Sequence, residues 1–150
     1  MNGKIALIIG ILIIAGGITG VVMYKTSPAQ QAKAVVENFY SFEQKGEYSD
    51  SWQLFHPLMK EKFAKGPYIQ DRAHVFMNHF GVDTFSFSIE EMKKIKNWRM
   101  EKGAKPFPIA YSMTVAQTFR GKYGLFTLHQ KVVVTKVKEK WVVTWDYHKK

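Results

Sequence analysis

The chain opens with an uninterrupted apolar run, residues 5–23 (IALIIGILIIAGGITGVVM), which contains no charged side chain. At ~1.5 Å per residue, a helix of this run would span ~28 Å, close to the thickness of the hydrocarbon layer of a bilayer. A long helix packed on a soluble core would show a polar face, and this run shows none. We therefore expect a membrane anchor over residues 1–26, with a helix at about 5–23 and the lipid bilayer as its partner.

A cleaved signal peptide is the alternative to an anchor that stays attached. Apolar regions of signal peptides run for roughly 7–15 residues and end at small residues. This run is longer, Tyr24 and Lys25 follow it directly, and a weak cleavage motif at residues 32–34 lies well beyond it. We favour an uncleaved signal-anchor, which usually sends the trailing domain outward. The expected location is therefore the cell membrane, single-pass, with the C-terminal domain outside the cytoplasm.

Behind the anchor, apolar side chains recur at helical spacing as far as residue 80. Ser27 is a suitable N-cap, Pro28 a suitable first helical residue, and Gly46 ends the pattern that starts there. The Gly66-Pro67 pair predicts a second break. The expected helical segments are residues 28–45, about 50–55 and 68–80, with a further turn or helix from residue 57.

From residue 84 the hydrophobic period changes to two, which predicts half-buried antiparallel strands. The alternating segments are residues 84–89, 107–119, 126–134 and 141–147. Gln117 and Gln130 each interrupt the apolar side of their segment. Residues 120–124 and 138–140 are typical of hairpin connections. Residues 90–105 stay ambiguous between a mobile loop and an extension of the first strand.

Helices followed by strands predict an α+β domain over residues 27–150. We expect about three helices, arranged as a cone, packed on a curved four-stranded antiparallel sheet. Each large aromatic side chain buries ~150–250 Å², so a few of them supply most of a core of this size. The aromatic residues therefore predict a filled interior, in which Tyr48, Trp52, Trp141 and Trp145 are core residues.

The charge of the chain narrows the class of partner. It carries 22 Lys and Arg against 12 Asp and Glu, a formal net charge of +10, which attracts polyanions such as nucleic acid, anionic lipid head groups or acidic wall polymers. No RNP1 motif or zinc-finger spacing occurs, so no specific nucleic acid is expected. The lack of cysteine excludes disulfides and fits an envelope protein. A solvated basic surface beside an anionic membrane is the preferred interpretation.

Candidate catalytic groups are few. Asp71 and His74 lie three residues apart on one expected helix and could pair, so an acid–base enzyme would use them. Glu43, Glu47 and Asp50 are interpreted as surface charge. Motifs for a serine nucleophile or a phosphate-binding loop are missing, and no catalytic residue is assigned in the preferred interpretation.

The histidines do not predict a metal site. His74 and His79 are five residues apart, which places them on different faces of an α-helix. The sequence also contains neither a His-Glu-x-x-His motif nor a cysteine. We therefore expect neither a metal nor a cofactor.

A set of aromatic and glycine positions carries a family resemblance. The positions are Gly46-Glu-Tyr48-x-x-x-Trp52-x-Leu54, Phe63, Tyr68, Phe80-Gly81, Tyr123-Gly124 and Lys140-Trp141-x-Val143-x-Trp145-Asp146. Over residues 28–148 their order resembles the nuclear-transport-factor-2-like domain, most closely the N-terminal domain of some Gram-positive penicillin-binding proteins, which also follows one membrane anchor. The resemblance implies a cone of helices on a curved sheet and a non-catalytic spacer or contact role.

The resemblance has two limits. The printed chain ends soon after Trp145-Asp146, where those penicillin-binding proteins continue into a dimerisation region and a transpeptidase. Transpeptidase activity is therefore not carried over. Other members of the superfold are isomerases or dehydratases with acid–base residues in the cone, and the fold alone does not decide between these roles.

The expected function is that of a non-catalytic accessory or partner-binding module of the bacterial cell envelope, with other envelope proteins as partners. The alternative is a small-ligand-binding protein or acid–base enzyme with an open cone pocket. A third hypothesis is electrostatic binding to wall polymer or lipid head groups. A closed aromatic core favours the first, and a buried polar pair in a cavity the second. The expected contact surface comprises Lys93, Lys94, Lys96, Arg99, Arg120, Lys122, Lys136 and Lys138.

Overall fold

A computed structural model of the protein describes residues 27–146. The expected anchor helix at residues 5–23 lies outside the described residues. The chain divides into two compact units, Met1–Gln31 and Ala32–Lys150, and the second contains the whole sheet and nearly all of the helical layer. Within residues 27–146, no helix combines the length and the apolar character that crossing a membrane requires.

The helical half contains four α-helices and one π-helical segment within the described residues, where about three helices were expected. They are α2 (Pro28–Gln44), α3 (Tyr48–Gln53), α4 (Pro57–Lys62), α5 (Lys65–His74) and η1 (Val75–Phe80). Helices α3 and α4 are separate because the backbone between them pairs with the sheet. Phe55 forms a parallel bridge with Val143, and the His56 N–H donates to the Val143 carbonyl over 2.8 Å.

The break predicted at Gly66-Pro67 is wrong, because both residues lie in the first turn of α5. A proline is tolerated there, since its missing N–H would have no partner within the helix. Helix α5 then continues directly into the π-helix η1. Gly81 follows the segment in the left-handed conformation (φ 62°), so the helical region ends at residue 80, as predicted.

The sheet confirms the predicted four antiparallel strands. They are β1 (Ser86–Trp98), β2 (Phe107–Gly121), β3 (Gly124–Val137) and β4 (Lys140–Trp145), in the order β1-β2-β3-β4. Both predicted hairpin connections are present. The ambiguous segment is resolved as a strand extension as far as Trp98, with a bulge between Glu90 and Lys93, where Glu91 has φ 52°. The rest of it, residues 99–105, belongs to the connection between β1 and β2.

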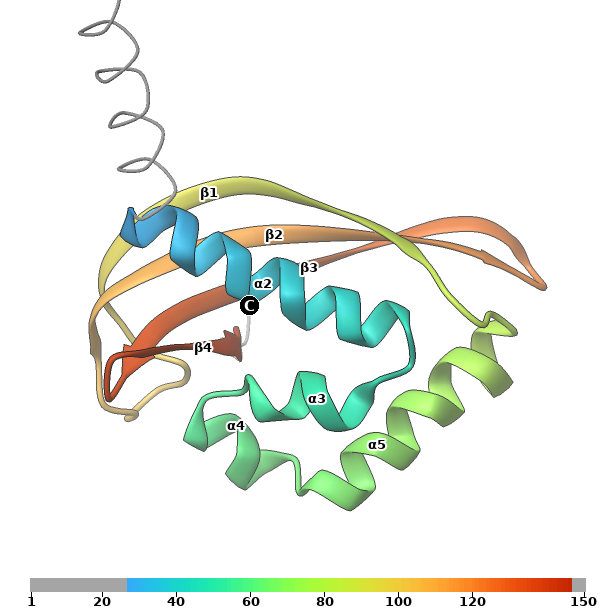
Figure 1. Ribbon diagram of the computed structural model, residues 1–150, viewed down its shortest axis with the longest axis horizontal. Coiled ribbons are helices and arrows are strands. Elements are labelled where there is room, and N and C mark those ends of the chain that lie inside the picture. Colours follow the sequence, from blue (N-terminus) through green and yellow to red (C-terminus); the bar gives the residue numbers. More distant parts are fainter. Residues whose placement is uncertain (1–26, 147–150) are drawn as a thin grey trace, which may run out of the picture. The chain divides into compact units, whose positions relative to one another are not determined.

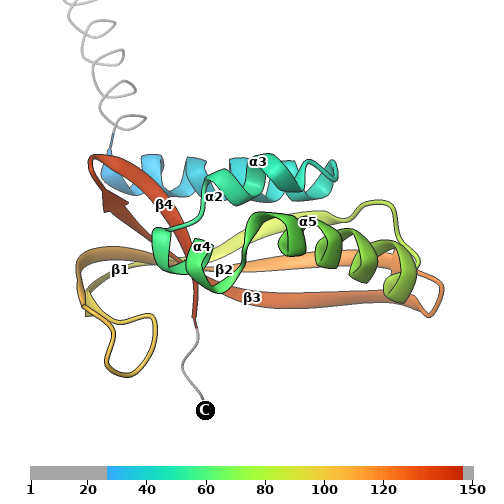
Figure 2. The ribbon, with the colours of Figure 1, turned by 90° about the horizontal axis from the view of Figure 1, so that it is seen from below.

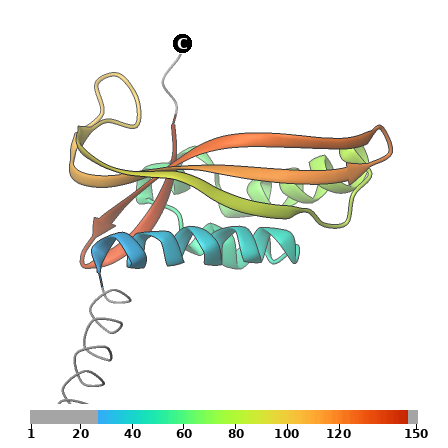
Figure 3. The ribbon, with the colours of Figure 1, turned by 90° about the horizontal axis from the view of Figure 1, so that it is seen from above.

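The helices of the second unit cover one face of the sheet, as Figure 1 shows with the long strands arching over them. Helix α5 lies in front of the strands in Figure 2 and behind them in Figure 3. The far end of the β2–β3 hairpin packs against η1, where the Lys122 N–H donates to the Phe80 carbonyl over 3.2 Å. Gly121 makes this approach possible, since a Cβ there would lie 2.3 Å from the Phe80 oxygen.

Aromatic rings fill the space between the helices and the β4 end of the sheet. Phe39 and Phe55 are fully buried, and their ring centroids are 5.0 Å apart. The half-buried Trp145 packs edge-on against both, at 6.2 and 5.0 Å. Tyr48 is buried as expected, whereas Trp52 and Trp141 are half-buried. Aromatic side chains therefore fill the core at this end of the second unit, but of the four aromatic residues predicted to be core residues only Tyr48 is buried.

Candidate functional site

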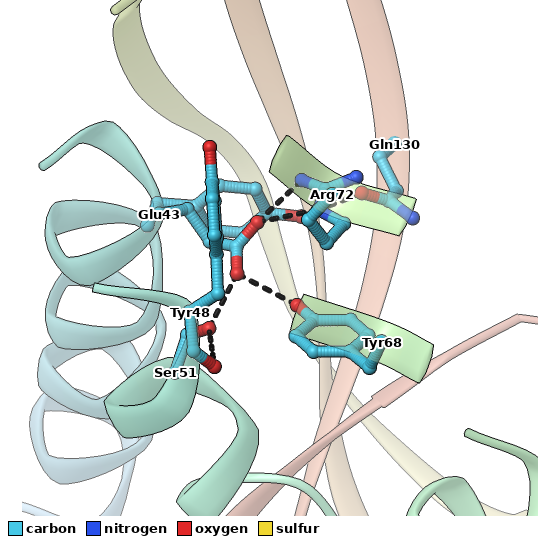
Figure 4. A network of polar contacts seen from close by, with 7 residues as sticks. Glu43, Tyr48, Ser51, Tyr68, Arg72 and Gln130 are labelled. Atoms are coloured by element: carbon cyan, nitrogen blue, oxygen red, sulfur yellow. Dashed lines mark hydrogen bonds and ion pairs between the residues drawn. The ribbon is translucent and has the colours of Figure 1, made fainter. Parts of the chain in front are cut away.

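A buried carboxylate, Glu43 near the C-terminus of α2, forms the centre of a polar network between the helices (Figure 4). Its side chain is fully buried. One carboxylate oxygen accepts hydrogen bonds from the Ser51 and Tyr68 hydroxyls, the latter over 2.6 Å. The other lies 2.6 Å from Nε and 2.5 Å from Nη2 of Arg72. Three helices, α2, α3 and α5, thus converge on one carboxylate.

The expectation that Glu43 is surface charge is wrong. The residue follows Ala32, Val36 and Phe39 at helical spacing, and all of these are buried, so it lies on the buried face of α2. A buried charge is stable only when it is paired and hydrogen-bonded. The missed signal was the position of an acid in the apolar stripe, together with an arginine on a later helix that could neutralise it.

The surrounding pKa shifts follow from burial. Burial raises the pKa of the Tyr40 hydroxyl above its usual value, and it does the same for Tyr68, where the nearby Glu43 carboxylate adds to the shift. Burial alone would lower the pKa of Arg72, but the charge and hydrogen bond of Glu43, together with Tyr68 and Tyr40, outweigh burial and raise the pKa. Both tyrosines therefore stay protonated and act as hydrogen-bond donors near neutral pH.

These contacts decide what Glu43 can do chemically. A general base needs a lone pair aimed at the proton that it removes. The Glu43 oxygens already face a guanidinium and two hydroxyls, and the pair with Arg72 is held by short, charge-assisted contacts. The network is therefore structural: it holds α2, α3 and α5 together.

The candidate acid–base residues lie elsewhere, on the outer side of the helical layer. Asp71 and His74 are both exposed. The His74 Nδ1 atom lies 2.7 Å from the Asn78 side-chain amide nitrogen. Its ring also packs against His79, with centroids 4.7 Å apart. The prediction that His74 and His79 occupy different faces is wrong, because a π-helix brings residues five apart together.

A cavity of about 320 Å³ lies between η1 and the inner face of the β2–β3 pair. Its lining combines aromatic and aliphatic side chains with a few polar ones: Arg72, Val75, Phe76, Phe80, Gln117, Phe119, Leu128, His129 and Gln130. Neither Asp71 nor His74 belongs to this lining. The predicted filled interior is therefore incomplete at this end of the second unit.

The two glutamines that interrupt the strands both line this cavity. In the β2–β3 register Gln117 pairs with Leu128, and Val115 pairs with Gln130, so the glutamines are diagonal neighbours on one face. Gln130 accepts a 2.8 Å hydrogen bond from the Tyr40 hydroxyl. Gln117 is 4 % exposed, and its Nε2 donor is buried without a hydrogen-bond partner in the described part of the chain.

The predicted contact residues are all exposed, but they form two groups at opposite ends of the long strands. At one end, Lys94 and Lys96 lie near the C-terminus of β1 and pair with Tyr111 and Ile109 near the start of β2. At the other end, Arg120 lies near the C-terminus of β2, close to the start of β1. About ten residues of strand, or ~30 Å, separate the ends. The near group comprises Lys93, Lys94, Lys96, Arg99, Lys136 and Lys138; the far group comprises Arg120 and Lys122.

Each basic group includes exposed apolar side chains. Ile109 is 49 % exposed and pairs directly with Lys96 of the near group, and the exposed Met92 directly precedes Lys93. The far group surrounds the hairpin tip, where Tyr123 is 82 % exposed. Two of the near cations have acidic neighbours, at 3.9 Å between Lys93 and Glu91 and at 3.4 Å for Lys136. Such exposed pairs are largely screened by solvent.

Residues 27–146 contain no cluster of three or more His, Asp or Glu side chains that could hold a metal ion. Neither a protein-family model nor a curated protein sequence matches the chain. The resemblance to the nuclear-transport-factor-2-like domain therefore stays a prediction.

Proposed function

We propose that the protein is a single-pass, membrane-anchored extracytoplasmic domain that acts as a non-catalytic partner-binding module of the bacterial cell envelope. The finer fold assignment, a nuclear-transport-factor-2-like cone behind a transmembrane helix, belongs to the same proposal. The apolar run at residues 5–23 supports the anchor. The four-stranded antiparallel sheet covered on one face by helices is compatible with the cone.

The observation that supports the non-catalytic role is that both oxygens of Glu43 are already bound by other side chains of the protein. Within the described residues it is the one acidic side chain that is buried, and both of its oxygens are occupied by Arg72, Tyr68 and Ser51. The other candidate acid, Asp71, is exposed and lies outside the cavity lining. A carboxylate held in this way by a guanidinium and two hydroxyls stabilises the fold, and both of its oxygens face these donors instead of a substrate proton.

The near basic group is the surface that we assign to the partner. It joins cations to exposed apolar side chains, Ile109 and Met92, on the edge strand β1 and its neighbour. Complementary charge guides protein partners to each other, and exposed apolar side chains add a contact that attraction to a polyanion does not need. We therefore expect an envelope protein that presents acidic residues around an apolar contact.

Crosslinking and pull-down from native membranes test this assignment. A Lys94→Glu/Lys96→Glu double variant should abolish recovery of the partner, while Arg120→Glu/Lys122→Glu, with the same change in charge at the far group, should retain it. Equal loss in both variants, with binding that falls steeply with salt, would instead indicate non-specific attraction to wall polymer or lipid. Protease treatment of intact cells tests the orientation: a fully protected domain would contradict it.

A further inference from the structure

We propose that the cavity between η1 and the β2–β3 pair binds a small neutral molecule that presents a carbonyl-type oxygen to Gln117 and an apolar body to the surrounding phenylalanines. This site is distinct from the basic surface assigned to a protein partner, and it requires no catalysis. It has a polar end, at Gln117 and Arg72, and apolar walls.

The unpaired amide of Gln117 is the first observation behind this inference. Buried polar groups in proteins are nearly always hydrogen-bonded, so an exception indicates a missing partner. Gln130, two residues away diagonally on the same face, has such a partner in the Tyr40 hydroxyl. Gln117 has none among the described residues, and it lines a cavity in which an acceptor atom could sit. The missing partner is therefore a hydrogen-bond acceptor.

Arg72 indicates the charge of that acceptor. Its Nη2 atom is buried and lies 2.5 Å from Glu43 in an ion pair, without an aligned hydrogen bond. The guanidinium can thus offer an N–H group to the cavity, but its positive charge is already matched by the Glu43 carboxylate. An anionic ligand would gain little attraction and would lose its hydration. A neutral carbonyl or amide oxygen fits this end better.

The apolar walls define the rest of the ligand. The Phe76 and Phe119 rings are stacked with centroids 5.5 Å apart, and the Phe80 ring stands edge-on to Phe119 at 5.4 Å. A volume of about 320 Å³ is at the small end of the range for small-molecule pockets. Leu128, which is 43 % exposed, belongs to the lining and shows that the cavity reaches the surface. A single ring or a short acyl chain would fit.

Three probes that share one benzene ring and are similar in size separate the possible chemistries: benzamide (neutral acceptor), benzoate (anionic acceptor) and benzylamine (cation without an acceptor). Each is titrated at millimolar concentration against the full chain in lipid nanodiscs, with the side-chain amide resonances of the glutamines observed by NMR. We expect saturable binding of benzamide that shifts Gln117 most strongly. Benzoate should bind about tenfold more weakly, and benzylamine should not bind.

Variants distinguish a ligand contact from a structural one. Gln117→Leu should weaken benzamide binding about tenfold or more, whereas Gln53→Leu, at an exposed glutamine of α3, should leave it unchanged. Gln117→Leu should also raise the melting temperature of the unliganded protein, because it removes an unpaired buried donor. A structural glutamine would lower it.

Several results would overturn the proposal. These are saturation by none of the probes, equal binding of all three, or benzamide binding that survives Gln117→Leu. A lower melting temperature for that variant, combined with unchanged binding, would assign Gln117 to the fold alone. Preferential binding of benzoate would overturn the neutral charge that we infer.

Discussion

The two ends of the helix–sheet interface of the second unit are built differently. At the β4 end, Phe39 and Phe55 pack with tilted rings, and Trp145 contacts both of them edge-on. At the hairpin end, phenylalanines of η1 and β2 surround a cavity of about 320 Å³ with two glutamines in its wall. The same chemistry of aromatic side chains therefore gives a solid core at one end and a lined cavity at the other.

The comparison teaches how to interpret a buried polar group. Glu43 is surrounded by donors for both of its oxygens, so its burial is explained by the fold itself. Gln117 is also buried, with 4 % of its surface exposed, yet its Nε2 donor has no partner in the described residues. An unpaired buried donor destabilises the folded state. The satisfied Glu43 therefore indicates a structural role, whereas Gln117, which is unpaired and lines a cavity, is the group for which we infer a ligand.

Among the substitutions proposed here, replacement of Glu43 should have the largest effect on stability. A small effect would contradict the structural role that we assign to Glu43. Glu43→Gln keeps the shape but leaves the Arg72 charge buried and unpaired, which should lower the free energy of unfolding by about 3–5 kcal/mol. Urea unfolding followed by tryptophan fluorescence measures this, because all four tryptophans lie beyond residue 50.

Two further variants serve as controls for Glu43. Adding Arg72→Met removes the unpaired charge and should restore most of the lost stability. Glu37→Gln breaks the exposed pair with Lys33, whose side chains are 52 % and 38 % exposed, and should change stability by less than about 1 kcal/mol. If Glu43→Gln had as small an effect as Glu37→Gln, Glu43 would not be a structural anchor.

Much of the fold could be predicted because the hydrophobic period is a local property. The period of two predicted four strands and their hairpins, and the helical spacing predicted the layer that covers them. What could not be predicted depends on contacts distant in sequence. The separation of α3 from α4 requires Phe55 to meet Val143, and the extension of β1 to Trp98 requires the pairing partners on β2.

The site was less predictable than the fold, for a related reason. Gln117 was recognisable as an interruption of its strand, but only the register with β3 and the position of η1 place it in a cavity. Glu43 was misassigned because its partner Arg72 lies 29 residues away on another helix. The expected pair of Asp71 and His74 followed α-helical spacing, and its residues lie outside the cavity lining.

Substitution of Gly121 tests the packing at the hairpin end, and its expected effect on stability is intermediate. A Cβ in Gly121→Ala would lie 2.3 Å from the Phe80 oxygen, so the hairpin and η1 must separate. Overpacking of this kind should lower the free energy of unfolding by about 1–3 kcal/mol. Hydrogen exchange of the Lys122 amide, which donates to that oxygen, should accelerate.

Gly66 provides the matched control for Gly121. It lies in α5, and an added Cβ would meet no atom within 4 Å. Gly66→Ala should therefore stabilise the protein by about 0.5–1 kcal/mol through the lower backbone entropy of the unfolded chain. Equal and small effects of both substitutions would show that the hairpin does not depend on close contact with η1.

His56, the N-cap residue of α4 at the filled end, should have the smallest effect on stability. Its Nδ1 accepts a hydrogen bond from the Leu58 N–H, and burial beside the Phe107 ring lowers the pKa of the imidazole. Below about pH 6.5 the unfolded chain binds a proton that the folded state resists, so stability falls as the pH drops from there towards the lowered pKa. We expect the free energy of unfolding, measured with urea, to decrease over this window. His56→Asn keeps a capping oxygen but does not titrate, so this variant should flatten the dependence of stability on pH. Substitution of the exposed His129 is the control and should leave that dependence in place. A dependence unchanged by His56→Asn would assign the acid sensitivity to another group.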